Sequence, residues 1–258
     1  MARLIQFHVP QNFRPPQRKG VLLEQRGKII QFPNAAIRKS AEALGRHCAD
    51  CTYSVRYALM QGLRVEEPCM QSNRSLFIPV ILGTARMGRM SLHAAQLVTG
   101  ELGKCEGVQT ELIDIAKLPL PTNDAGEAIK QAEFSANMSK ADALVVVSPE
   151  YNHGYSGLLK HVLDSCLKEY IHKAVGIVGV SAGPFGGTRV IENLLPVMRE
   201  IGMVTIFWDV NFSSVQKVFA EDGRLLDESY IRRIDKFLKE LIWMAKTLRQ
   251  GREQISLN

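Results

Sequence analysis

The sequence lacks any apolar run that approaches the ~20 residues needed to span a bilayer. Its first ten residues carry Arg3 and His8 but no apolar core followed by a small-residue cleavage site, so we expect no secretory signal. Cysteine is scarce, and the five cysteines form an odd number. This content argues against a disulfide-stapled scaffold and is typical of a reducing compartment, so we expect a cytoplasmic protein with free thiols.

Two common nucleotide-binding signatures are absent. The segment from Gly83 to Ser91 is not closed by Gly-Lys-Ser/Thr, so it is not a Walker A loop. The segment from Ser181 to Thr188 contains several glycines, but their spacing does not match G-x-G-x-x-G. Neither a P-loop nor the usual dinucleotide-binding fingerprint is therefore expected.

Excess positive charge is confined to one end of the chain. Residues 1–74 carry a balance of +7, whereas the remainder is close to neutral at −1. The first part shows no sustained periodicity, so we expect residues 1–74 to be a basic extension that is largely irregular or partly helical. Residues 75–258 are expected to form the functional domain, and no nucleic acid is expected as a partner of this core.

The extension also holds a cysteine pair. Cys48-Ala-Asp-Cys51, with His47 and Cys69 nearby, has residue types that bind zinc. A further ligand at regular spacing is missing, and the pair does not open a helix in a βαβ unit. We therefore expect free thiols and no metal site, with zinc as the alternative.

From Leu76 onward, short apolar segments alternate with amphipathic ones. The expected strands cover residues 76–82, 108–114, 144–147, 174–180 and 203–208, and helices are expected over 91–102, 127–140, 188–201 and 228–248, with another opening at 158. Five β units joined by helices predict an α/β domain with a doubly wound parallel sheet. The count fits the flavodoxin-like order 2-1-3-4-5, whose ligand crevice lies between the first and third strands.

The segment from Ala143 to Asp164 carries the most informative functional pattern. It opens with an apolar strand rich in β-branched residues, and Pro149 ends the ladder because it has no N–H to donate. The loop that follows offers backbone polar groups together with Tyr151 and Tyr155. A loop in this position binds ligands in open α/β sheets, and its chemistry suits a flat ring with a polar edge. We therefore expect a bound cofactor rather than a side-chain nucleophile.

Two more loops follow the first and fourth strands. The first offers hydroxyl and guanidinium groups and a helix N-terminus, a set that suits a phosphate: Thr84, Arg86, Arg89 and Ser91. The glycine-rich loop 181–188 allows backbone N–H groups to approach a ligand closely. Because all three loops lie at the carboxyl ends of neighbouring strands, they predict a mononucleotide site.

This combination of motifs resembles the NADPH-dependent FMN reductases, flavodoxin-like enzymes that include quinone, azo-dye and chromate reductases. The resemblance covers residues 76–248 and rests on three motifs in order. It implies that the FMN phosphate is held by Thr84, which stands where the family commonly has Ser, and by Arg86 and Ser91. It also implies residues along the isoalloxazine ring and at its other side: Pro149, Glu150, Tyr151, Asn152 and His153, then Ser181, Gly183 and Gly186.

By this resemblance the protein is an FMN-dependent NAD(P)H oxidoreductase with no catalytic side chain. NADPH delivers hydride, and after NADP⁺ leaves, a quinone, free flavin, azo compound or metal oxyanion takes the electrons in the same pocket. One shared site predicts ping-pong kinetics. The resemblance also implies a homodimer or homotetramer. The candidate contact is the segment from Tyr155 to Lys168, with Leu158, Leu159 and Val162, and the alternative is that some of these residues pack against their own sheet.

Two alternatives belong to other classes. Gly179-Val-Ser-Ala-Gly183 matches the G-x-S-x-G nucleophile elbow, which would make Ser181 the nucleophile of a hydrolase. Such hydrolases place their histidine after the serine, whereas no histidine follows Ser181 here, so only an unusual triad with His153 stays open. The other alternative is a flavodoxin-like electron carrier without an NADPH site.

Overall fold

The structure is a computed structural model that describes residues 74–121 and 129–256. The predictions for the basic extension, and the alternative zinc site at Cys48 and Cys51, lie outside these residues. Within the described ranges, no helix has the length and apolar character needed to cross a bilayer.

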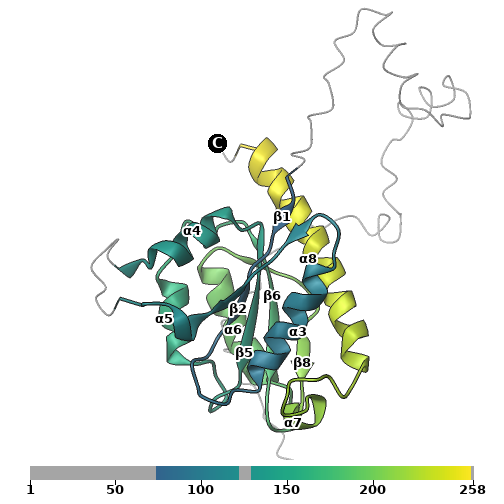
Figure 1. Cartoon of the computed structure of the whole chain (residues 1–258). Coiled ribbons are helices and arrows are strands. Elements are labelled where there is room, and N and C mark those ends of the chain that lie inside the picture. The colour runs from purple at the N-terminus through teal and green to yellow at the C-terminus, as the bar shows by residue number, and fades with distance from the viewer. Residues whose placement is uncertain (1–73, 122–128, 257–258) are drawn as a thin grey trace, which may run out of the picture. The chain divides into compact units, whose positions relative to one another are not determined.

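A parallel sheet lies between two layers of helices (Figure 1). Its strands run across the sheet in the order β4 (Leu112–Asp114), β2 (Val80–Leu82), β5 (Ala143–Pro149), β6 (Ala174–Val180) and β7 (Val204–Thr205). A further strand, β8 (Val210–Phe212), pairs with the carboxyl-terminal half of β6, beyond the part that pairs with β7. The predicted α/β fold with a parallel sheet is confirmed, although the sheet has six labelled strands because β7 and β8 share its last position.

The two faces of the sheet are covered by different helices. Alternate side chains of β5 explain why: Val145 and Val147 belong to one apolar cluster, and Leu144 and Val146 belong to another. The first cluster is closed by α3 (Ser91–Gly103) and α8 (Ser229–Gln254). The second is closed by α4 (Ala132–Lys140), α5 (Gly157–Asp164) and α6 (Thr188–Glu200). Burial on both faces accounts for the continuous apolar runs of β5 and β6.

The first two predicted strands are each interrupted. Leu76–Phe77 forms β1 and Val108–Gln109 forms β3, and these pair with each other as a separate parallel ladder. Pro79 lies between β1 and β2, and the N–H groups of Ile78 and Val80 on either side of it donate to the Gln109 and Glu111 carbonyls at 2.9 and 2.8 Å. Opposite it, the Thr110 hydroxyl donates to the Ile78 carbonyl at 2.8 Å. The break therefore depends on how the two strands meet at Thr110.

Three smaller elements were not predicted. The 3-10 turn η2 (Ile115–Lys117) follows β4, and Asp114 caps it by accepting the Ala116 N–H at 3.1 Å. Strand β8 and the short helix α7 (Val215–Val218) lie in a segment expected to be irregular. Of these, α7 lines the candidate cavity described below, whereas Lys117 of η2 lines a separate groove along β4.

The segment expected to form a subunit contact packs largely against its own chain. Leu159 and Val162 are both fully buried in the core cluster that α5 shares with the sheet. They are therefore not available to a second subunit, and these two residues follow the alternative of packing against the chain's own sheet. Leu158 is only half-buried.

Candidate functional site

A cavity of about 230 Å³ lies where the loop after β2 meets the carboxyl ends of β5 and β6. Its walls include seven of the residues expected from the sequence: Arg86, Arg89, Ser91, Pro149, Glu150, Tyr151 and Ser181. They also include residues that were not expected: Gly88, Met90, Val180, Ala182, Val215 and Gln216. The fold thus brings the three loops to one cavity.

Five expected residues do not line this cavity. Thr84 is buried behind it, where its hydroxyl and the Tyr151 hydroxyl lie 2.8 Å apart. Asn152 and His153 are exposed at the tip of a turn. Gly183 is exposed and Gly186 is buried, and both lie outside the walls.

The N-terminus of α3 forms the end of the cavity best suited to an anion. Ser91 is 2% exposed, and its hydroxyl has no hydrogen-bond partner among the described residues. The N–H groups of Met90 and Ser91 likewise have no acceptor within the described part of the chain. Arg86 is exposed beside them and brings a positive charge. Unused donors at the N-terminus of a 13-residue helix are a favourable environment for a phosphate.

Arg89 lines the cavity, but its charge is already paired. Its Nη2 lies 2.5 Å from Oδ2 of Asp114, and its Nη1 donates to the Arg86 carbonyl at 3.3 Å. The side chain is only 14% exposed, and its Nε has no partner among the described residues. The two terminal nitrogens of Arg89 are therefore engaged within the chain, and its Nε is the guanidinium donor that lacks a partner among the described residues.

A tight turn shapes the second loop. The backbones of Tyr151 and Gly154 exchange two hydrogen bonds of 2.8 and 2.9 Å, and Asn152 and His153 between them have φ of 49° and 70°. Two consecutive positive φ values define a type I′ turn, and a non-glycine residue such as His153 needs support to hold one. Asn193 of α6 gives that support by donating to the His153 carbonyl at 2.7 Å.

Hydrogen bonds made by side chains of the second loop connect it to the first loop and to the start of α6. Glu150 accepts from the Arg189 N–H at 3.3 Å and from Arg189 Nη1 at 3.0 Å, so its carboxylate links the loop to the start of α6. Tyr151 links it to the first loop through Thr84, and the Arg86 guanidinium lies 5.1 Å from the Tyr151 ring centroid. Ser156 caps α5 and donates to the Gly83 carbonyl at 2.8 Å. The loop is therefore pre-organised.

The backbone of the third loop packs closely against the backbone of β6. A Cβ on Gly179 would lie 2.7 Å from the Gly186 carbonyl oxygen and 2.8 Å from that of Gly187. Gly187 itself has φ of 79° where it precedes α6. Glycine is required at these positions because the loop folds back onto β6.

Ser181 is not arranged as a nucleophile. Its hydroxyl donates to the Gly183 carbonyl at 2.8 Å, and no histidine of the described residues makes a hydrogen bond to it. The serine-hydrolase alternative therefore gains no support from the geometry.

Most backbone donors nearest the cavity are already used. The N–H groups of Glu150, Tyr151 and Ser181 donate to the carbonyls of Val180, Gly154 and Phe212. Within the described part of the chain, the N–H groups of Asn152 and His153 have no acceptor. The turn therefore holds the unused donors of the second loop.

Two of the residues that sequence reasoning missed, Val215 and Gln216, come from α7, which lies outside the three expected loops. Val215 donates its N–H to the Ser181 carbonyl at 3.1 Å, and Ser214 donates to the Gly183 carbonyl at 2.8 Å. These bonds place Val215 and Gln216 against the third loop. No periodic pattern marks the segment 209–226, so only the fold reveals their role.

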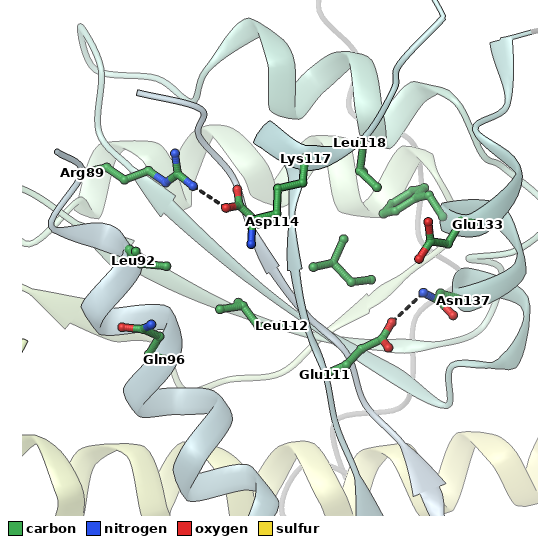
Figure 2. A pocket seen from close by; sticks show the side chains of 12 residues that line it. Arg89, Leu92, Gln96, Glu111, Leu112, Asp114, Lys117, Leu118, Glu133 and Asn137 are labelled. Carbon is green, nitrogen blue, oxygen red and sulfur yellow. Dashed lines mark hydrogen bonds and ion pairs between the residues drawn. The ribbon is translucent and has the colours of Figure 1, made fainter. Parts of the chain in front are cut away.

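A larger groove of about 570 Å³ runs along the edge strand β4 between α3 and α4. Figure 2 shows polar bridges toward its two ends, from Arg89 to Asp114 and from Glu111 to Asn137. Arg89 lines both this groove and the smaller cavity. Among the described residues, no three His, Cys, Asp or Glu side chains are grouped to hold a metal ion.

Comparisons with known proteins identify the family. The sequence profile of the family described as NADPH-dependent FMN reductase matches residues 77–216. An NAD(P)H-dependent FMN reductase of Pseudomonas aeruginosa is 30% identical over 182 residues, covering 64% of this chain and 94% of that protein. A probable NADPH:quinone oxidoreductase of Oryza sativa is 28% identical over 204 residues, covering 70% of this chain and 94% of that protein.

Solved structures agree with this assignment at the level of fold. A flavoenzyme NAD(P)H:acceptor oxidoreductase of Paracoccus denitrificans superposes with a TM-score of 0.57 at 20% identity, covering 67% of this chain and 98% of that one. The predicted flavodoxin-like fold class is confirmed by such neighbours. The family match spans more than half of the 258 residues. This chain therefore belongs to the NADPH-dependent FMN reductase family and is an oxidoreductase that works with FMN and a nicotinamide nucleotide.

Proposed function

We propose that the cavity of about 230 Å³ is the FMN site, and that NADPH and an electron acceptor react there in turn. The observation that carries the proposal is the Ser91 hydroxyl, which is buried, lines the cavity and has no partner among the described residues. An orphaned buried hydroxyl is costly unless a ligand completes its hydrogen bonding.

The donor set at this end fits a phosphate. Ser91 offers its hydroxyl and N–H, Met90 offers a second N–H, and Arg86 offers an exposed guanidinium. A phosphate group brings negative charge and strong acceptor oxygens to donors of this kind. In our proposal these three residues hold the phosphate, and Thr84 supports them from behind through Tyr151.

The other end of the cavity suits the ring. Pro149, Tyr151 and Ala182 line it, and the unused N–H groups of Asn152 and His153 lie in the adjoining turn. The Glu150–Arg189 pair holds that turn against α6, so the donors are presented by rigid backbone. FMN bound here would supply the redox chemistry between NADPH and the acceptor. The residues of this chain bind, orient and exclude water.

A planar acceptor matches the surface beside the third loop. Phe185 of the third loop is 58% exposed, and the Arg189 guanidinium lies over its ring at 4.5 Å from the centroid, so one face of the ring is covered and the rest of the side chain is exposed. We propose a quinone as the acceptor class, with free flavin, azo compounds and metal oxyanions as further acceptors.

Steady-state kinetics test the shared site. If NADPH and a water-soluble quinone occupy the same position in turn, double-reciprocal plots of rate against quinone at several NADPH concentrations will be parallel. NADP⁺ should then compete with the quinone. Lines that intersect to the left of the axis would show that both substrates bind together, which contradicts the proposal.

Assembly and location complete the proposal. We propose a homodimer or homotetramer, to be measured by light scattering as a multiple of the 28.8 kDa chain mass. We place the protein in the cytoplasm because Cys105 and Cys166, the two cysteines among the described residues, are free thiols. A measured mass of one chain would contradict the first statement.

A further inference from the structure

Asp114 ends the edge strand β4 and uses its two carboxylate oxygens for different purposes. Oδ1 accepts the Ala116 N–H at 3.1 Å and so caps η2. Oδ2 accepts a hydrogen bond from Nη2 of Arg89, a residue of the loop before α3. Both side chains are largely buried, at 14% exposure for Arg89 and 11% for Asp114. A buried pair of this kind is held firmly, since separating it leaves an uncompensated charge.

The same guanidinium also holds the backbone of its own loop. Nη1 of Arg89 donates to the Arg86 carbonyl at 3.3 Å. Arg86 is the residue whose exposed side chain brings positive charge to the cavity. A planar guanidinium has a fixed fork of donors, so it joins the end of β4 to the loop in one geometry. Figure 2 shows the Arg89–Asp114 bridge bordering the groove along β4.

We infer that Asp114 is a positioning residue for the phosphate end of the flavin site: through the two terminal nitrogens of Arg89 it holds the loop 83–91 in place, and these nitrogens are not phosphate ligands. This inference rests on the proposed function of the cavity. It assigns the direct contacts to Arg86, Ser91 and the start of α3.

The competing arrangement has the opposite consequence. If the terminal nitrogens of Arg89 were direct ligands of the phosphate, Asp114 would compete with the phosphate for them. Removing the Asp114 charge would then release Arg89 and tighten FMN binding. If Asp114 instead holds the loop through Arg89, an arrangement we call the tether, removing its charge should weaken FMN binding because the loop loses its attachment to β4. The sign of the change therefore separates the two arrangements.

Asp114→Asn is the matching variant. The amide keeps an oxygen for the Ala116 N–H and replaces the other oxygen with an NH₂ group that cannot accept from Arg89. We expect the Kd for FMN, measured from flavin fluorescence with the full chain, to rise about tenfold, the usual scale for a lost hydrogen bond to a charged group. Riboflavin has no phosphate, so its Kd should stay unchanged.

Glu111→Gln is the control. Glu111 lies on the same edge of the sheet and bridges to Asn137, without contact to Arg89. The substitution removes one carboxylate charge from the same groove, and we expect it to leave both affinities unchanged. A Kd for FMN that falls or stays constant in Asp114→Asn would overturn the inference. Equal weakening of FMN and riboflavin would overturn it too, because a general structural role does not distinguish them.

Arg89→Lys is a second variant that tests the same inference if Asp114→Asn does not fold. Lysine keeps the positive charge for a phosphate but loses the fork that joins Asp114 to the Arg86 carbonyl. The tether predicts weaker FMN binding with unchanged riboflavin binding, whereas unchanged FMN binding would refute it. If the wild-type protein binds neither flavin, the proposed function fails instead, so the two failures are distinguishable.

Discussion

Ser91 and Arg89 lie close together in the loop that opens α3, yet their side chains meet different surroundings. The Ser91 hydroxyl is buried without a partner among the described residues, whereas both terminal nitrogens of the Arg89 guanidinium are engaged, with Asp114 and with the Arg86 carbonyl. Both residue types suit a phosphate, so the sequence alone assigns them the same role. Only burial and partners separate a residue that awaits a ligand from one that holds the loop.

Ser91→Ala tests the first of these roles. Loss of the hydroxyl removes one donor from the phosphate end, so we expect the Kd for FMN to rise about tenfold while the Kd for riboflavin is unchanged. Ser139→Ala is the control, because Ser139 is an exposed serine of α4 whose hydroxyl bonds only within its helix. If Ser91→Ala binds FMN as tightly as the wild type, the phosphate lies elsewhere.

The sequence could predict which residues gather at the site, but not how they are paired. Hydroxyls, glycines and prolines at strand ends are local signals, and Ser91, Pro149 and Ser181 do line one cavity. Glu150 and Arg189 are 39 residues apart, and Arg89 and Asp114 are 25 apart. Such pairs depend on the relative position of separate elements, for which one sequence carries no local signal.

Glu169 provides a pH-dependent contribution to stability away from the site. Burial alone would raise the pKa of its carboxyl, but hydrogen bonds from Lys130, its own backbone, Ser135 and Leu167 lower it from 4.5 to about 2. The unfolded chain therefore binds more protons between pH 4.5 and 2. The stabilisation is fully present above pH 4.5 and is lost as pH falls toward 2.

Glu169→Gln should therefore destabilise the protein mainly at neutral pH. A shift of this size corresponds to roughly 3 kcal/mol, taken as an upper bound for a side chain that is only 10% exposed. We expect urea unfolding to show a clear loss at pH 7 and a much smaller one at pH 3. The same loss at both values would show that the carboxylate charge is not responsible.

At the scale of elements, the strands were easier to predict than their ends. β5 and β6 are continuous apolar runs because helices bury both faces, and such runs are strong signals. The breaks at Pro79 and Thr110 depend on how two strands meet. α7 has no amphipathic pattern, and its position follows from bonds to the third loop. The sequence analysis therefore missed the elements whose positions depend on tertiary contacts and not on a periodic pattern of apolar residues.

Gly179→Ala tests the packing of the third loop against β6. The new Cβ would meet two backbone oxygens at 2.7 and 2.8 Å, and backbone cannot move aside as a flexible side chain can. We expect a loss of about 1–3 kcal/mol in the free energy of unfolding, the usual cost of overpacking. FMN binding should weaken as well, because Ser181, two residues further along the chain, lines the cavity and would be displaced with the strand end.

Gly100→Ala is the matched substitution in an open position. A Cβ on Gly100 meets nothing within 4 Å, and alanine is the better helix former, so this variant should be as stable as the wild type or more so. Equal stability of Gly179→Ala and the wild type would mean that the loop does not need its close approach to β6.

At the scale of the molecule, the sheet places one cavity at the carboxyl ends of β5 and β6 and leaves the opposite end to structural contacts. There, Asp142 is 1% exposed and pairs with Arg74 at 2.8 Å. Arg249 and Arg252 of α8 approach the same carboxylate at 3.6 Å. These ion pairs hold α8 against the end of the sheet that lies away from the candidate cavity. The residues that stabilise this part of the fold are therefore separate from those that line the cavity.

The central claim is that the three loops form an FMN site reduced by NADPH. Its most direct test is an absorbance spectrum of the purified full chain, recorded before and after NADPH is added without oxygen. We predict a flavin spectrum that bleaches with NADPH and returns when a quinone is added. A flavin spectrum that NADPH leaves unchanged, or a protein that neither contains nor takes up FMN, would contradict the account.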